Sequence, residues 1–89
     1  MITPIIPPVV NLNGTSREAL TEQLLAASDA IRLAQNAFMA AMPNGRDYQT
    51  YQTPGLISEL ARARHIEEGT KLSQAAEYID ALLVKVVGQ

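Results

Sequence analysis

The sequence predicts an all-α protein: an antiparallel hairpin of two long helices with an extended, proline-rich N-terminal arm, completed by homo-oligomerisation into a helical bundle. Two segments, about 15–42 and 54–87, repeat apolar residues at helical spacing. Pro4, Pro7 and Pro8 exclude helix from the start of the chain. With 89 residues and no cysteine, the chain buries a small core and forms no disulfide. Association with copies of itself is therefore the expected source of further stability.

Residues 1–12 are expected to form the arm, and residues 13–89 the hairpin domain. An extended apolar segment without a strand partner would be buried most simply along a groove, either in its own chain or in a neighbour's. A disordered terminus is the alternative. The arm's large aliphatic residues are Ile2, Ile5, Ile6, Val9 and Val10.

The first helix is predicted to begin at Thr15 and to end at Met42. Thr15 and Glu18 have the spacing of a capping box, in which each side chain bonds to the other residue's backbone amide. Asn13-Gly14 supplies a turn just before it. Pro43 disfavours helical geometry in the residue before it, which is why the helix should end there.

This helix carries two apolar rows, which predicts two packing partners. A hairpin supplies one partner, so the second row predicts self-association, and alanine would allow the helix axes to approach closely. The first row is Leu20, Leu24, Ala27, Ile31, Ala34, Phe38 and Ala41, and the second is Ala26, Ala30, Leu33, Ala37 and Ala40.

The connection, residues 43–53, should start with a tight turn in which Asn44 or Gly45 has a positive φ. The second helix is expected to start with Thr53 as cap and Pro54 as its first residue, and to end at Gly88. Its buried side is predicted to consist of Leu56, Leu60, Ala63, Ile66, Leu72, Ala76, Ile79, Leu83 and Val86.

Two further features of the second helix are expected from its sequence. Arg64 with Glu68 and Glu67 with Lys71 are spaced for ion pairs at i, i+4. Gly69-Thr70 marks a weak point, a kink, or a place where another backbone comes close. The β-branched end, residues 82–87, also fits a strand, but its length and continuing period favour helix.

The loop after the first helix is the foremost candidate for a ligand site. Arg46 offers a guanidinium for a phosphate or carboxylate, and Asp47 can orient it. Tyr48 and Tyr51 offer surfaces on which a base could stack. The competing interpretation is structural: Asp47 pairs with Arg46 or caps the turn, and the tyrosines cover the end of the hairpin.

A second candidate lies at the start of the first helix, around Asn13, Thr15 and Arg17. Exposed amides at a helix N-terminus form a natural anion site, although a capping box would already satisfy them. The two candidates lie about 35–40 Å apart at 1.5 Å per residue. An antiparallel neighbour would have to bring them together, so a shared ligand site would lie between subunits.

No pattern in the sequence indicates an enzyme, a metal site or a cofactor. His65 stands alone among Arg62, Arg64, Glu67 and Glu68, which is typical of a surface or boundary residue, and no nucleophile or partner acid accompanies it. Phosphate-binding glycine loops, zinc-protease helices and nucleophile elbows are absent from the sequence.

Charge and hydropathy limit the expected partners and location. The formal charge of −2 argues against a surface that coats a nucleic acid polymer. The apolar start lacks a basic n-region and is interrupted by prolines, so it makes a poor signal peptide. We therefore expect a cytoplasmic protein with no membrane association.

The segments LNGTS, residues 12–16, and PNGRDY, residues 43–48, resemble a group of small phage and prophage proteins of similar length with two helices. The resemblance covers the hairpin from Leu12 onward and leaves out the arm. Small phage helical oligomers include anti-defence "sponges" that sequester cyclic nucleotides or related immune signals between subunits. By this analogy the chain would sequester an anionic small molecule.

Two hypotheses of function follow. In the first, an oligomer binds a nucleotide-like signal through the two candidate sites. In the second, the protein is a structural or interaction module, such as a phage assembly factor or an inhibitor of a host protein, without a small-molecule ligand. The surplus of exposed apolar surface would then bind another protein.

Overall fold

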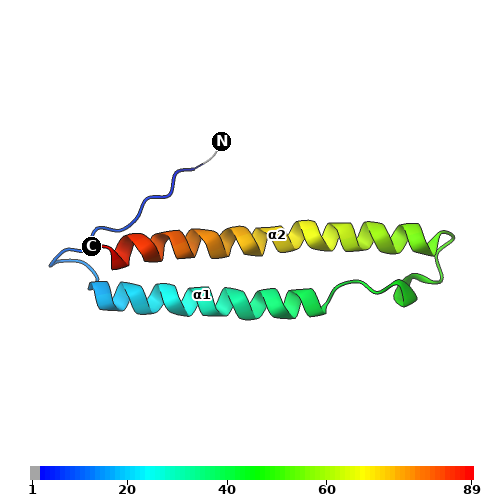
Figure 1. Ribbon diagram of the computed structural model, residues 1–89, viewed down its shortest axis with the longest axis horizontal. Helices are drawn as coiled ribbons and strands as arrows, with labels where there is room; N and C mark the ends of the chain where they lie inside the picture. Colours follow the sequence, from blue (N-terminus) through cyan, green and yellow to red (C-terminus); the bar gives the residue numbers. More distant parts are fainter. Residues whose placement is uncertain (1–2) are drawn as a thin grey trace.

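The computed structural model describes residues 3–89, and this part of the chain forms two antiparallel helices joined by one short turn (Figure 1). Helix α1 spans Arg17–Ala40, the 3-10 turn η1 spans Gly45–Tyr48, and helix α2 spans Pro54–Val87. The described residues contain no strand, so the all-helical hairpin is confirmed and residues 82–87 are helical.

Helix α1 begins two residues later than expected. Ser16, not Thr15, is its N-cap, and the Ser16 hydroxyl accepts a hydrogen bond from the Ala19 amide at 3.1 Å. The turn before it closes at Asn11–Gly14, where the Gly14 amide donates to the Asn11 carbonyl. Thr15 follows that turn and lies outside the helix, so the predicted capping box is wrong.

Helix α1 also ends earlier than expected, at Ala40, with Ala41 as its C-cap. The Met42 amide donates to the Met39 carbonyl at 3.1 Å, three residues back, so the last turn tightens before Pro43. Asn44 then turns the chain through its side chain, which accepts from the Arg46 amide at 3.1 Å. No described residue has a positive φ, so the predicted left-handed residue at Asn44 or Gly45 is wrong.

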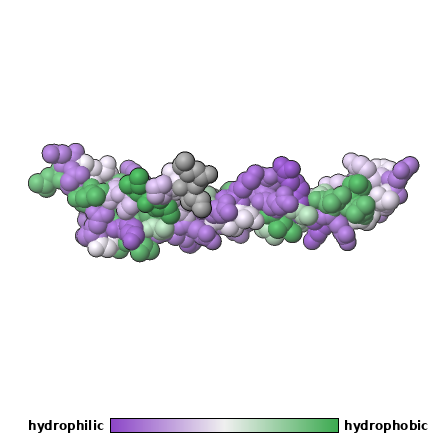
Figure 2. All heavy atoms as spheres, turned by 90° about the horizontal axis from the view of Figure 1, so that it is seen from above, coloured by the Kyte–Doolittle hydropathy of each residue, from purple (hydrophilic) through white to green (hydrophobic). Residues whose placement is uncertain are grey.

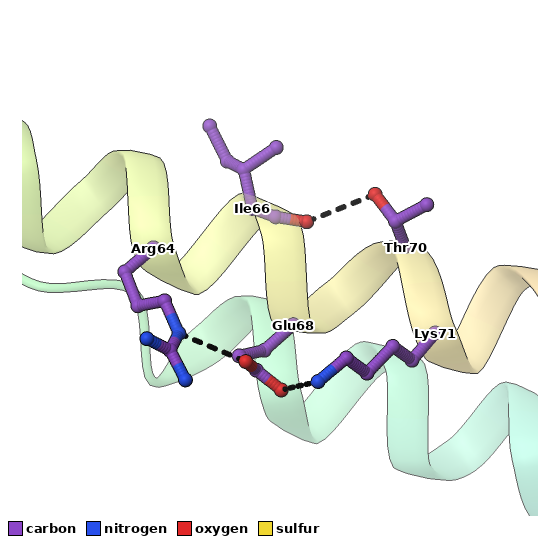
Figure 3. Close-up of polar contacts among 5 residues, drawn as sticks. All are labelled: Arg64, Ile66, Glu68, Thr70 and Lys71. Atoms are coloured by element: carbon purple, nitrogen blue, oxygen red, sulfur yellow. Dashed lines mark hydrogen bonds and ion pairs between the residues drawn. The ribbon is translucent and has the colours of Figure 1, made fainter.

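Helix α2 begins and ends where the sequence predicts. Thr53 occupies the cap position, although its side chain makes no capping hydrogen bond, and Pro54 is the first helical residue. Gly88 is the C-cap, and its amide donates to the Val84 carbonyl at 3.1 Å. The helix runs unbroken through Gly69-Thr70, where the Thr70 hydroxyl donates to the Ile66 carbonyl (Figure 3).

The face of α1 that packs on α2 follows the predicted row for about three turns, from Leu20 to Ile31, and matches it only at Phe38 after that. Leu20, Leu24, Ala27, Ile31 and Phe38 lie on this face, half-buried. The predicted Ala34 and Ala41 are exposed, and the next residues, Gln35 and Met42, are half-buried instead. A straight helix has 3.6 residues per turn, so a strict 3.5-residue row drifts off its face over this length.

The inner face of α2 matches the prediction only in its C-terminal half. Leu72, Ala76, Ile79 and Leu83 are half-buried, and Val86 is fully buried. In the N-terminal half the expected residues are all exposed, namely Leu56, Leu60, Ala63 and Ile66. The buried or half-buried residues there are instead Ile57, Ser58, Ala61, His65 and Gly69. His65 and Gly69 contact Phe38 of α1, whereas Ser58 lies opposite Gly45 of η1.

The core between the helices is small. Among the described residues, the buried hydrophobic side chains are Leu82 and Val86, near the open end of the hairpin, and of these Val86 is fully buried. Ser28 is buried as well, and its hydroxyl donates to a carboxylate oxygen of Asp80 at 3.1 Å. The helices are thus held by one line of modest side chains and a few polar contacts.

The hairpin is a thin rod, 64 × 28 × 17 Å, with a radius of gyration of 18.9 Å (Figure 1). A compact chain of this length would have a radius of about 12 Å. Its accessible surface is 6829 Å², whereas a typical monomer of this mass exposes about 5,100 Å². Two helices alone leave most of their surface in contact with solvent.

The arm is attached at its base, and Ile5, Ile6 and Val9 stay exposed while Val10 is half-buried. The Gln89 side chain accepts from the Val10 amide at 2.8 Å and donates to the Pro8 carbonyl at 2.7 Å. Ile6 is nevertheless 79% exposed and Val9 76%. Burial in a groove of its own chain is therefore wrong for these residues, burial against a neighbour stays a prediction, and Ile2 lies outside the described residues.

Gly69 of α2 faces the ring of Phe38 of α1. A Cβ atom at Gly69 would lie 3.3 Å from Cε1 of Phe38, whose ring is stacked on His65. An aromatic ring, rather than another backbone, explains the glycine. At Gly55, in the first turn of α2, a Cβ atom would have no such neighbour within 4 Å.

We predict that Gly69→Val lowers the free energy of unfolding by about 1–3 kcal/mol, because the new methyl groups overpack Phe38. Gly55→Val is the matched control and should be neutral or stabilising, since valine is the better helix former. Urea denaturation followed by circular dichroism measures both. A Gly69→Val variant as stable as the unsubstituted protein would contradict the packing described.

Candidate functional site

The outer surface of α1 carries a row of apolar residues that the hairpin leaves uncovered. All five residues of the predicted second row are exposed, and Leu33 is 71% exposed. A helix turns 100° per residue, which places this row on the side of α1 away from α2. We call it the α1 stripe: Ala26, Ala30, Leu33, Ala37 and Ala40.

Helix α2 contributes a second apolar surface near the connection. Leu56 and Leu60 are 56% and 58% exposed. Further along α2, a groove of about 250 Å³ lies between the helices, and its lining includes Phe38, Met39, Ile66 and Gly69. Seen from the α2 side, hydrophobic side chains reach the surface toward both ends of the rod, and hydrophilic ones dominate between them (Figure 2).

The Arg46 loop lies beyond the end of α1, on η1 and the bend that follows it (Figure 1). Arg46 and Asp47 are both exposed, and among residues 3–89 no acceptor lies within hydrogen-bonding distance of the Arg46 guanidinium. The Tyr48 and Tyr51 rings are stacked, with centroids 6.0 Å apart and planes 26° apart. The structure thus brings these four residues onto one turn.

The tyrosine pair fits both interpretations of the loop. Tyr48 is half-buried against the end of the hairpin, as a covering residue would be, while Tyr51 is largely exposed. The predicted pairing of Arg46 with Asp47 is not observed, because no ion pair links them in the described chain. Asp47 instead contributes its backbone amide, which donates to the Asn44 carbonyl at 3.0 Å.

The second candidate site, at the start of α1, lies beside a cavity of about 630 Å³ formed with the base of the arm. Arg17 faces the C-terminal end of α2, where its guanidinium donates to the Gln89 backbone oxygen at 2.7 Å and lies 3.8 Å from Glu18. The Asn13 amide is bonded to the Asn11 side chain at 3.0 Å, and Thr15 is exposed. The Arg17 side chain therefore links the start of α1 to Gln89, which follows the end of α2.

The two candidate sites stand at opposite ends of α1, as the sequence predicts. The helix has 24 residues, which corresponds to about 36 Å. Within one chain Arg46 and Arg17 cannot contact the same small ligand.

His65 has a structural task. Its Nε2 lies 2.6 Å from the Phe38 carbonyl oxygen, an acceptor, so the ring donates from that nitrogen. The two rings stack with centroids 3.9 Å apart. His65 thus satisfies a carbonyl in the last turn of α1 while filling the interface, which explains a histidine at a boundary position.

Glu68 joins two cations on the α2 surface (Figure 3). Its carboxylate accepts from Arg64 and from Lys71, each at 2.8 Å. The Lys71 contact first, and then Arg64, lower the pKa of Glu68 below its ordinary value. The predicted Arg64–Glu68 pair is confirmed, whereas Lys71 pairs with Glu68 rather than with Glu67.

Sequence reasoning missed two polar residues that organise the hairpin. Gln89 ties the arm to α2, and Asp80 receives Ser28 from across the interface with Arg32 4.0 Å away. Ser28 directly follows Ala27 of the predicted row, so a polar residue on the edge of that row was the available signal.

The described residues contain no cluster that could hold a metal ion and no helix that could span a membrane. Within residues 3–89, no three histidine, aspartate or glutamate side chains gather closely enough to hold a metal ion. Neither helix combines the length and the apolar content that crossing a membrane requires, over the same residues.

Comparison with protein-family models, curated proteins and solved structures found no match to this chain.

Proposed function

We propose that the protein is a helical interaction module that works as a homo-oligomer, through the apolar outer surfaces of its two helices. The observation that carries the proposal is the contrast between core and surface. Buried hydrophobic side chains among the described residues number two, Leu82 and Val86, whereas Leu33, Leu56, Leu60 and Ile66 each expose more than half of their surface.

The size of the exposed surface supports association. The chain exposes about 1,700 Å² more than a typical monomer of its mass. A stable interface of standard size covers roughly 800 Å² on each partner. The surplus is therefore about twice the surface that one such interface covers on each partner.

The arrangement of charges supports an interaction surface over a catalytic one. Glu68 pairs with both Arg64 and Lys71, and Asp80 lies near Arg32, so these three cations have carboxylate partners on the outside of the rod. His65 bonds to a backbone carbonyl. These groups thus serve the hairpin itself and do not form a catalytic cluster.

Charged substitutions on the outer surface test this function. We predict that Leu33→Glu and Leu60→Glu each weaken association by about 10- to 100-fold, since burial of a leucine side chain contributes about 1.5–3 kcal/mol, and that each variant is helical at concentrations at which it still associates. Gln52→Glu, which adds the same charge on the exposed connection, is the control. Sedimentation velocity measures association, and circular dichroism measures folding.

The proposal fails if the unsubstituted protein is a folded monomer at micromolar concentration. It also fails if both leucine variants associate as strongly as Gln52→Glu does. Loss of association at only one of the two positions supports the proposal and tells which helix carries the interface.

A second candidate function is sequestration of a nucleotide-like anion, in the manner of phage anti-defence sponges. The observation that favours it is the Arg46 guanidinium, exposed and without a hydrogen-bond acceptor in the described chain, on the same turn as two stacked tyrosines. A guanidinium binds phosphate in a bidentate manner, and an aromatic face binds a base.

Calorimetry with cyclic dinucleotides, cyclic trinucleotides and cyclic ADP-ribose species tests this second function. We expect one of these ligands to release heat, and Arg46→Ala to lower its affinity by about tenfold or more, because a charge-assisted hydrogen bond is lost. Arg62→Ala is a control cation, since Arg62 is already bonded to the Pro43 carbonyl. No heat with any of them, or equal binding by Arg46→Ala, would contradict sequestration at this loop.

A further inference from the structure

We infer that the α1 stripe is the docking surface for a second copy of this chain, which runs antiparallel to the first with Leu33 near the two-fold axis. The inference rests on the proposed function, because it presupposes that the protein associates with itself. It adds the surface, the direction and the register of that association.

The α1 stripe has nearly the same residue spacing in both directions from Leu33. Leu33 stands in the centre, with Ala30 and Ala37 three and four residues away and Ala26 and Ala40 seven residues away on either side. A two-fold interface uses the same surface on both partners, so it must be complementary to itself. An antiparallel helix pair centred on Leu33 meets this condition, since it sets Ala26 of each copy opposite Ala40 of the other.

The side chains of the stripe suit a close contact between helices. Alanine on both sides lets two helix axes approach to the short end of the usual 8–10 Å range. Leu33, 71% exposed in the single chain, would be removed from water at the centre of the contact. Asp29 and Asn36 are both exposed beside the stripe, and the two-fold axis places Asp29 of one copy next to Asn36 of the second copy.

Charge favours the antiparallel direction. The first two turns of α1 carry Glu18 and Glu22, both exposed, and Arg46 lies beyond its other end (Figure 1). An antiparallel copy brings its Arg46 to the acidic end, and it also pairs opposite ends of the helix dipoles. A parallel copy would set glutamates beside glutamates and Arg46 beside Arg46.

The same arrangement has a consequence for ligand binding. The Arg46 loop of one copy comes to the end of α1 where Arg17 and the 630 Å³ cavity of the other copy lie. The two regions that stand about 36 Å apart within one chain thus meet across the interface. A ligand site built from both would be complete only in the dimer.

Single cysteines test the register directly, because the native chain contains none. Leu33→Cys should cross-link to itself with a short bismaleimide, giving a shift from the monomer to the dimer band. Ala26→Cys alone should stay monomeric on the gel, since two copies of residue 26 would lie about 21 Å apart at 1.5 Å per residue. A mixture of Ala26→Cys with Ala40→Cys should then form the cross-linked dimer that neither forms alone.

Arg64→Cys, on the exposed side of α2, serves as the control that should not cross-link to itself. Self-cross-linking of Ala26→Cys would indicate a parallel pair and would overturn the inference, while the proposed function stands. Association in sedimentation without any cross-link through α1 would overturn it in the same way. A monomer in sedimentation with no cross-link would instead contradict the proposed function itself.

Discussion

The constraint on which the rest of the structure depends is that two helices meet along one line. Each helix buries a single face, and most of the leucine, isoleucine and phenylalanine side chains on those faces stay half-buried. The result is a 64 Å rod whose buried hydrophobic side chains, among the described residues, are Leu82 and Val86. A contact of this size offsets little of the conformational entropy lost on ordering the chain. Burial of the outer surfaces by association would supply what the hairpin lacks.

Polar contacts within the hairpin specify how the helices align rather than how strongly they bind. The Ser28–Asp80 hydrogen bond ties the helices toward their open end, and the His65–Phe38 contact fixes them near the connection. Each such bond contributes about 0.5–1.5 kcal/mol net, but a buried partner left unpaired would cost more. These contacts therefore disfavour a pairing in which one helix is shifted along the other, which apolar contacts alone would permit.

The sequence predicted the helical elements well and their faces less well. Pro43, Pro54 and Gly88 act through local backbone geometry, so the ends of α2 were predictable and the end of α1 nearly so. The inner face of α2 was not, because Leu56, Leu60 and Ile66 look like core residues by hydropathy and yet face solvent. Hydropathy indicates which residues favour burial and does not indicate which partner buries them. For the candidate site, the grouping of Arg46, Tyr48 and Tyr51 followed from their closeness in sequence, whereas the tie from Arg17 to Gln89 joins residues 72 apart and had no local signal.

The central claim is that the folded state of this chain is an assembled state. Thermal unfolding followed by circular dichroism over a hundredfold range of protein concentration measures this most directly, because a folded oligomer that dissociates on unfolding becomes more stable as concentration rises. The midpoint temperature of unfolding is expected to rise steadily across that range. A midpoint independent of concentration, in a protein that is helical and unfolds cooperatively, would contradict it.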